Sequence, residues 1–303
     1  RYLQHMRVLP EYRKGHDVKS LWDDAAAAVL VEHYKDLGVS QDVALRVYTS
    51  RLLGGDPRLV LHGGGNTSLK TDALDTFGAK IDVLRVKGSG WDMADIEPAG
   101  LPELRLDPLR QLRDLDELTD KAMVNFERQQ LLDSNSPNPS VETLLHAFLP
   151  GKFIDHTHST AVLSLTNQPE GKEMCLDLFG DSVGIVPYIM PGFDLSKSAV
   201  EVFENNPNIE GLILLKHGVF TFGETARDSY ESMINLVSQV EKRLAMGKNR
   251  IFQTDTLPIK LMTAPEIAPM IRGACAIKDD NGYDGYKRFI LDFRSSGSIL
   301  NYV

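Results

Sequence analysis

Apolar side chains recur at helical intervals in several parts of the chain. Three stretches have this spacing and are followed by a glycine: residues 17–37, 41–53 and 225–246. Residues 104–132 are rich in Leu, Asp and Arg at mixed helical spacing, which predicts two helices. Pro139 predicts the start of a further helix that ends before Pro150, because proline is favoured at the first helical position.

Shorter apolar or alternating runs lie between these helices and predict strands. They are residues 58–62, 81–86, 153–158, 183–188 and 211–217. Strands and helices thus interleave over about residues 40–250, which indicates a layered α/β domain. After residue 249 several prolines and the polar turn 279–282 interrupt the pattern, so we expect a linker and a small appendix there.

The composition excludes several classes of protein. A net charge of −9 over 303 residues argues against a nucleic-acid partner. Cys175 and Cys275 are too few for a disulfide framework and too far apart in sequence for a zinc finger or an iron–sulfur site, which fits a reducing cytoplasm. No apolar run reaches about 18 residues, and the first residues resemble no signal peptide, so we expect neither a membrane protein nor a secreted one. Arg1 and the apolar last residues predict that both ends are cuts in a longer protein.

Three histidines form a candidate metal site. His156 and His158 alternate with Thr157 on a predicted strand, so their imidazoles project from the same side of it. His217 ends another predicted strand and is followed by a glycine that permits a close approach. Three neutral imidazoles are the ligand set of a catalytic zinc with one open position. The alternative is a surface pair beside an unrelated histidine.

Glu142 and two glycine-rich segments are further candidates. Glu142 is expected in the first turn of the helix that Pro139 opens, either as an exposed charge paired with His146 or as a site residue. Residues 63–68 and 87–90 read as turns that each follow a strand, and such turns expose backbone N–H groups to an anion. Neither matches a dinucleotide or P-loop fingerprint. With Ser140 near a helix start, they predict a phosphate pocket, although plain structural turns remain the alternative.

These residues together resemble the class II aldolase/adducin family. The matching blocks occur in the family's order and cover about residues 45–247: GNTS at 65–68, GSG at 88–90, PSVE at 139–142, HTH at 156–158 and KHG at 216–218. Longer strings are similar to the aldolase half of bifunctional rhamnulose-1-phosphate aldolase/short-chain dehydrogenase proteins: GGGNTS, VKGSG, ETLLHAFLP, DHTH and PGFDLSK. Residues 271–293 resemble the segment that leads to their dehydrogenase.

The resemblance implies a fold and a set of roles. The fold is a three-layer α/β/α class II aldolase-like arrangement, with a central, mainly antiparallel sheet flanked by helices. His156, His158 and His217 match the zinc ligands, with another divalent metal as the alternative, and Glu142 matches the catalytic carboxylate. The positions that hold the substrate phosphate are matched by Asn66, Ser89, Gly90 and Ser140. Val141 departs from the family, which has a second serine there, and no tyrosine proton donor is assigned.

The implied reaction is retro-aldol cleavage of a deoxy-ketose 1-phosphate, with L-rhamnulose 1-phosphate as the predicted substrate and dihydroxyacetone phosphate and lactaldehyde as the products. One alternative keeps the zinc site but epimerises a pentulose phosphate. Another is a non-catalytic adducin-like scaffold, which would be expected to lose the zinc histidines. The resemblance also implies a homotetramer that binds a small phosphorylated sugar.

We expect three regions along the chain. Residues 1–40 form an N-terminal helical extension, 41–250 the aldolase domain, and 251–303 a connector that leads to a missing dehydrogenase domain.

Overall fold

The computed structural model describes residues 17–62, 64–246, 262–280 and 282–293. The chain divides into two compact units at the boundary between Lys248 and Asn249, and each unit is described by itself. None of the described helices is long and apolar enough to cross a membrane.

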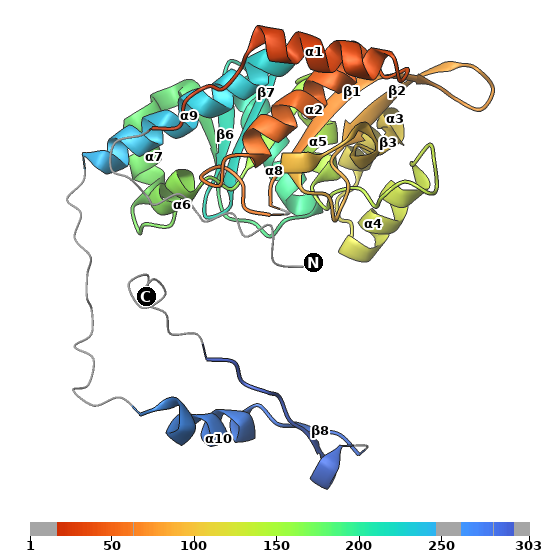
Figure 1. Ribbon diagram of the computed structural model, residues 1–303. Helices are drawn as coiled ribbons and strands as arrows, with labels where there is room; N and C mark the ends of the chain where they lie inside the picture. Colours follow the sequence, from red (N-terminus) through yellow and green to blue (C-terminus); the bar gives the residue numbers. More distant parts are fainter. Residues whose placement is uncertain (1–16, 63, 247–261, 281, 294–303) are drawn as a thin grey trace. The chain divides into compact units, whose positions relative to one another are not determined.

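The larger unit is built on a seven-stranded sheet with the strand order β3-β2-β1-β4-β7-β6-β5 (Figure 1). Only the β5–β6 pair is parallel, and the other neighbours are antiparallel. The strands are β1 (Asn66–Leu74), β2 (Lys80–Val86), β3 (Glu103–Arg105), β4 (Phe153–Thr157), β5 (Val183–Val186), β6 (Gly211–Leu214) and β7 (Gly218–Gly223). The predicted mainly antiparallel central sheet is confirmed.

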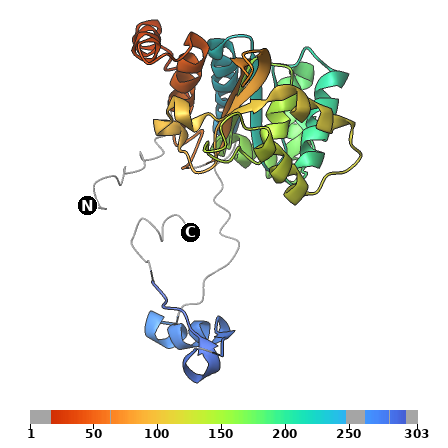
Figure 2. The ribbon, with the colours of Figure 1, turned by 90° about the vertical axis from the view of Figure 1, so that its right-hand side faces the viewer.

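Helices cover both faces of this sheet, and the layers can be followed in Figure 2. One face is covered by α2 (Gln41–Gly54), α6 (Thr160–Thr166), α7 (Gly171–Phe179) and α9 (Ala226–Ala245), with α1 (Asp24–Lys35) packed on α2. The other carries α3 (Leu106–Gln111), α5 (Thr143–Phe148) and α8 (Phe193–Asn205), with α4 (Asp120–Gln129) at its corner. The α/β class with helices on both faces of the sheet is therefore confirmed.

Strand β4 shows how the alternation of side chains divides the two layers. Asp155 points toward α2 and α9, where it forms a fully buried ion pair with Arg46 and accepts a 2.6 Å hydrogen bond from Ser229 Oγ. His156, the next residue, points to the opposite face and stacks on Phe220 with ring centroids 4.1 Å apart. Because neighbouring residues of a strand face opposite sides, the ion pair anchors the strand while the other face stays available for a site.

Two predicted elements in the N-terminal part of the larger unit differ from the structure: the first helix starts later than predicted, and one predicted strand is a turn. Residues 17–23 are not helical; α1 begins at Asp24, since Asp23 caps it by accepting a 2.7 Å bond from Ala26 N–H. Residues 58–62 are not a strand. Leu59 and Val60 donate to the carbonyl of Asp56, which closes a turn, and their side chains are apolar because they are buried in a core cluster.

The predicted helix before Pro150 is present as α5, but its predicted start at Pro139 is wrong. Pro139 instead forms an isolated bridge with Gly88, and α5 starts at Thr143 with Glu142 as its N-cap residue. Residues 104–132 contain the two expected helices, α3 and α4, but the segment starts within the short strand β3. Strands β1 and β7 were not predicted; β1 follows a glycine-rich segment that resembles a turn, and β7 follows β6 after a tight turn at Lys216 and His217.

The smaller unit is described over residues 262–280 and 282–293. It contains α10 (Ala264–Ala274), whose Thr263 and Glu266 form a capping box, and a short hairpin of β8 (Ile277–Lys278) and β9 (Tyr286–Lys287). The start of the predicted connector, around residue 251, lies outside the described residues.

Candidate metal centre and substrate cavity

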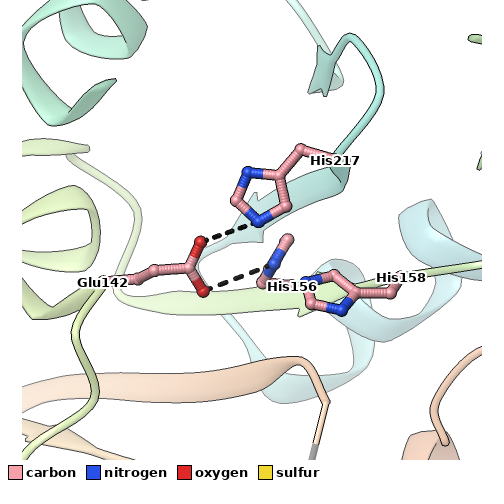
Figure 3. Close-up of side chains that lie close together, drawn as sticks. All are labelled: Glu142, His156, His158 and His217. Atoms are coloured by element: carbon pink, nitrogen blue, oxygen red, sulfur yellow. Dashed lines mark ion pairs between the residues drawn. The ribbon is translucent and has the colours of Figure 1, made fainter. Parts of the chain in front are cut away.

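The end of β4 and the turn between β6 and β7 bring the three candidate metal-binding histidines together. His156 lies in β4 and His158 directly after it, while His217 lies in the turn between β6 and β7. Strands β4 and β7 pair with His156 opposite Phe220, so the turn that carries His217 lies beside the end of β4. The ligand atoms of these three histidines and of Glu142 all lie within 4.8 Å of one another (Figure 3).

The turn that presents His217 has an unusual backbone. Lys216 has a φ of 61°, which is uncommon for a residue other than glycine, asparagine or aspartate. At Gly218, a Cβ atom would lie 2.4 Å from the carbonyl oxygen of Thr157. Glycine is therefore required for the close approach of this turn to β4.

Glu142 approaches the histidines from the other side, at the N-cap of α5. Its Oε1 lies 3.1 Å from His217 Nε2, and its Oε2 lies 3.4 Å from His156 Nε2 (Figure 3). Asn66 Nδ2 donates a 2.6 Å hydrogen bond to Oε2 and a 3.0 Å bond to Ser140 Oγ. His146 contacts Asn66 and Ser68 rather than pairing with Glu142 as the sequence left open.

The unsatisfied atoms of this cluster fit a bound metal. His156 Nδ1 lies 3.1 Å from the carbonyl oxygen of Val219, which only accepts, so Nδ1 carries the proton and Nε2 presents its lone pair. Three buried atoms of this cluster, His156 Nε2, His158 Nε2 and Glu142 Oε1, have no hydrogen-bond partner among the described residues, and His217 turns its Nε2 toward Glu142 Oε1 at 3.1 Å. A cation would satisfy such a group of lone pairs, because imidazole and carboxylate are borderline and hard ligands for divalent metals.

Burial favours the neutral form of His156 and His158, the form that binds a metal. It lowers the pKa of His156 to about 3 and lowers the pKa of His158. For Glu142 burial raises the pKa, but nearby His156 and His217 and the hydrogen bond from Asn66 outweigh it, so the net pKa lies below its usual value. Glu142 is thus a buried carboxylate in its charged form.

A cavity of about 260 Å³ opens beside Glu142 and His158. Its lining includes all four residues that the sequence assigned to a phosphate: Asn66, Ser89, Gly90 and Ser140. The segments meet because Ser89 N–H donates to the Asn138 carbonyl and its hydroxyl to the Pro139 carbonyl, which joins residues 88–90 to 138–140. The expectation that residues 63–68 are a turn after a strand is wrong, because residues 58–62 are not a strand and residues 66–68 already belong to β1.

Lys87 is a lining residue that the sequence reasoning did not select. It lies at the end of β2, is only 5% exposed, and faces the charges of Asp92 and Glu142. Burial lowers its pKa despite these carboxylates. A lysine at a strand end is ordinarily solvated, so the only sequence signal was its place directly before the glycine turn 88–90.

Comparisons with known proteins agree with this arrangement. The model of the Class II Aldolase and Adducin N-terminal domain matches residues 44–243. An uncharacterized oxidoreductase, YuxG of Bacillus subtilis, is 36% identical over 94% of this chain, and the chain spans only 40% of its length.

Two solved structures are also similar. The N-terminal class II aldolase domain of a conserved Thermoplasma acidophilum protein is 43% identical, with a TM-score of 0.64 over 67% of this chain and 93% of that one. An aldolase II superfamily protein from Pseudomonas syringae has a TM-score of 0.50 at 15% identity over 70% of this chain and 79% of that one, which shows a shared fold alone.

Proposed function

This chain belongs to the class II aldolase and adducin family, and we propose that it is a zinc-dependent lyase that cleaves L-rhamnulose 1-phosphate to dihydroxyacetone phosphate and lactaldehyde. The observation that carries the proposal is Glu142: a charged carboxylate against three histidines, on the wall of a cavity lined by hydroxyls, an amide and a lysine. The histidine cluster would hold the metal that stabilises negative charge formed in the reaction. The hydroxyls, the amide and the lysine would bind the phosphate of the substrate.

The metal would be held by His156, His158 and His217. Three imidazoles and a nearby carboxylate favour zinc, which takes nitrogen ligands and leaves a position for substrate. When bound, the ion supplies Lewis-acid stabilisation of the enediolate charge that forms when the C3–C4 bond breaks.

Glu142 would move the proton that converts the enediolate to dihydroxyacetone phosphate. Its Oε2 already accepts the hydrogen bond from Asn66, whereas Oε1 is buried, faces His217 Nε2 at 3.1 Å and accepts no assigned hydrogen bond from the described residues. We therefore assign the proton to Oε1. Glu142 is itself only 5% exposed, which limits competition from water for this proton.

The phosphate would bind in the same cavity, close to Glu142. Asn66, Ser89 and Ser140 supply polar groups, and Gly90, at a φ of 88°, leaves open space where a side chain would stand. Lys87 adds the positive charge that a phosphate monoester requires. These groups support a ketose 1-phosphate rather than an uncharged sugar.

The proposal extends to the longer protein to which this domain would belong. The chain spans 40% of the length of YuxG, an oxidoreductase by its printed name. We propose that this chain is the aldolase part of a fusion with a dehydrogenase, with residues 251–303 as the connector, that it is cytoplasmic, and that it assembles as a homotetramer.

The test is a triose-release assay on purified protein of known metal content. We expect one zinc per chain, dihydroxyacetone phosphate from rhamnulose 1-phosphate, and less from fuculose and ribulose 1-phosphates. Release from none of the three would overturn the proposal. A new sugar with no triose would identify an epimerase instead, and a chain that binds no metal and loses nothing on Glu142→Ala would be a scaffold.

A further inference from the structure

We infer that His146 is a positioning residue of this site: through Asn66, it holds the Glu142 carboxylate in the orientation that proton transfer needs. The inference rests on the proposed function, because it assigns a role in the same reaction. It concerns a residue that is fully buried and does not line the cavity.

A continuous chain of hydrogen bonds runs from Glu142 into the layer of α5. Asn66 Nδ2 donates to Glu142 Oε2 at 2.6 Å, and Asn66 Oδ1 contacts Nε2 of His146. On the other side of the ring, His146 Nδ1 lies 2.7 Å from Ser68 Oγ. Asn66 and Ser68 alternate on β1 and so face the same side of the sheet, which places both within reach of one imidazole.

The contacts of Asn66 determine the direction of the other bonds in this chain. Its side-chain nitrogen Nδ2 lies between two acceptors, Glu142 Oε2 and Ser140 Oγ, and donates to both. The other end of that amide is then Oδ1, which only accepts, so His146 must carry its proton on Nε2. His146 Nδ1 is therefore an acceptor, and the hydroxyl of Ser68 donates to it.

His146 is placed to prevent the Asn66 amide from turning over. If the amide rotated by half a turn, its Oδ1 would face the negative Glu142 and its Nδ2 would face the proton on His146 Nε2, so both contacts would become repulsive. The ring itself is held by packing against Phe220, whose face also stacks on His156. A metal ligand and the network behind Glu142 thus share one aromatic support.

Two substitutions separate this role from a merely structural one. In His146→Gln, the side-chain amide nitrogen reaches about the place of Nε2 and can still donate to Asn66 Oδ1. In His146→Asn, the shorter amide matches Nδ1, so it reaches Ser68 and not Asn66. Both are neutral and polar, so they are matched for burial of a polar group.

We expect His146→Asn to lower kcat for triose release roughly tenfold or more, with KM and bound zinc nearly unchanged, and His146→Gln to recover most of that loss. Equal losses in the two folded variants would overturn the inference. Circular dichroism and zinc content establish that each variant is folded.

A second measurement needs neither variant nor activity. In the zinc-loaded wild-type protein, ¹⁵N spectra of labelled histidines report which ring nitrogen is protonated. We expect His146 in the neutral form with its proton on Nε2; a proton on Nδ1 alone, or a doubly protonated ring, would overturn the inference. If the wild-type protein releases no triose from any ketose 1-phosphate, the proposed function is wrong. The tautomer of His146 still tests the inferred direction of its hydrogen bonds independently of that result.

Discussion

Two glutamates of this protein are buried to nearly the same degree and have opposite chemistry. Glu142 at the start of α5 is 5% exposed, and Glu127 in α4 is 1% exposed. Burial raises the pKa of Glu127 to about 8, and its Oε1 has no hydrogen-bond partner among the described residues. For Glu142 the same burial is outweighed by two histidines and Asn66, and the net pKa is lowered.

The difference shows that burial alone does not decide the charge of a carboxyl group. Glu127 lies beside Met123 and Phe126, which belong to an apolar cluster that also includes residues of β2 and α3. A carboxyl group there is most stable when it holds its proton. Glu142 meets donors and imidazoles on several sides, so its charged form persists at neutral pH.

Removing the charge of Glu142 is expected to have the largest effect. Glu142→Gln keeps the size of the side chain but cannot carry a proton between the enediolate and solvent. We expect triose release to fall by roughly 10²- to 10⁴-fold, with zinc content retained. A fall of less than tenfold would mean that another group moves the proton.

Glu127→Gln is the matched change in the other region and acts on stability. Below pH 4.5, the reference pKa, both folded and unfolded carboxyls are protonated; above it, the unfolded one ionises while the folded one holds its proton up to about pH 8. Wild type therefore loses stability as pH rises from 4.5 to 8, and the variant does not.

At pH 7 we expect Glu127→Gln to raise the free energy of unfolding by about 3 kcal/mol, with the gain disappearing near pH 4.5. Denaturant unfolding at several pH values measures this. Exposed Glu117→Gln is the control, because its charge is solvated in both states. An equal gain in the control, or a gain for Glu127→Gln that does not depend on pH, would contradict the prediction.

Lys87→Met tests whether the lysine beside Glu142 contributes to substrate binding in the cavity. We expect KM for the ketose 1-phosphate to rise roughly 10- to 100-fold, since a hydrogen bond to a charged group is lost. Steady-state kinetics with the phosphorylated and unphosphorylated sugar measure it. An equal rise for both sugars would show that Lys87 does not contact the phosphate.

The smallest effect is expected at Lys216, where backbone strain accompanies the presentation of His217. Lys216→Gly removes the cost of a side chain at a φ of 61°, partly offset by the greater freedom of glycine when unfolded. We expect a gain of about 0.5–1 kcal/mol in thermal unfolding with zinc content unchanged. A loss of stability would mean that the lysine side chain makes a stabilising contact that outweighs the strain.

The candidate site was predictable in part, for identifiable reasons. His156 and His158 follow from the two-residue period of a strand, and the family resemblance supplied Glu142 and the residues around the phosphate. The start of α5 was mispredicted because the preference of proline for a helix start was weighed without the bridge from Pro139 to Gly88, which joins residues 51 positions apart in sequence. Strand β1 was missed because its first residues belong to a glycine-rich string.

Local pattern by itself determined the α/β class, the strand that ends at the pair His156 and His158, and the long helix α9. These depend on side-chain periods and residue types that are read within one segment. Only the tertiary structure decided that Lys87 lies on the cavity wall, that Glu127 Oε1 is buried with no hydrogen-bond partner among the described residues, and that His146 contacts Asn66. Each of those facts depends on which distant segments pack together, because a side chain's charge state and its partners are set by neighbours in space.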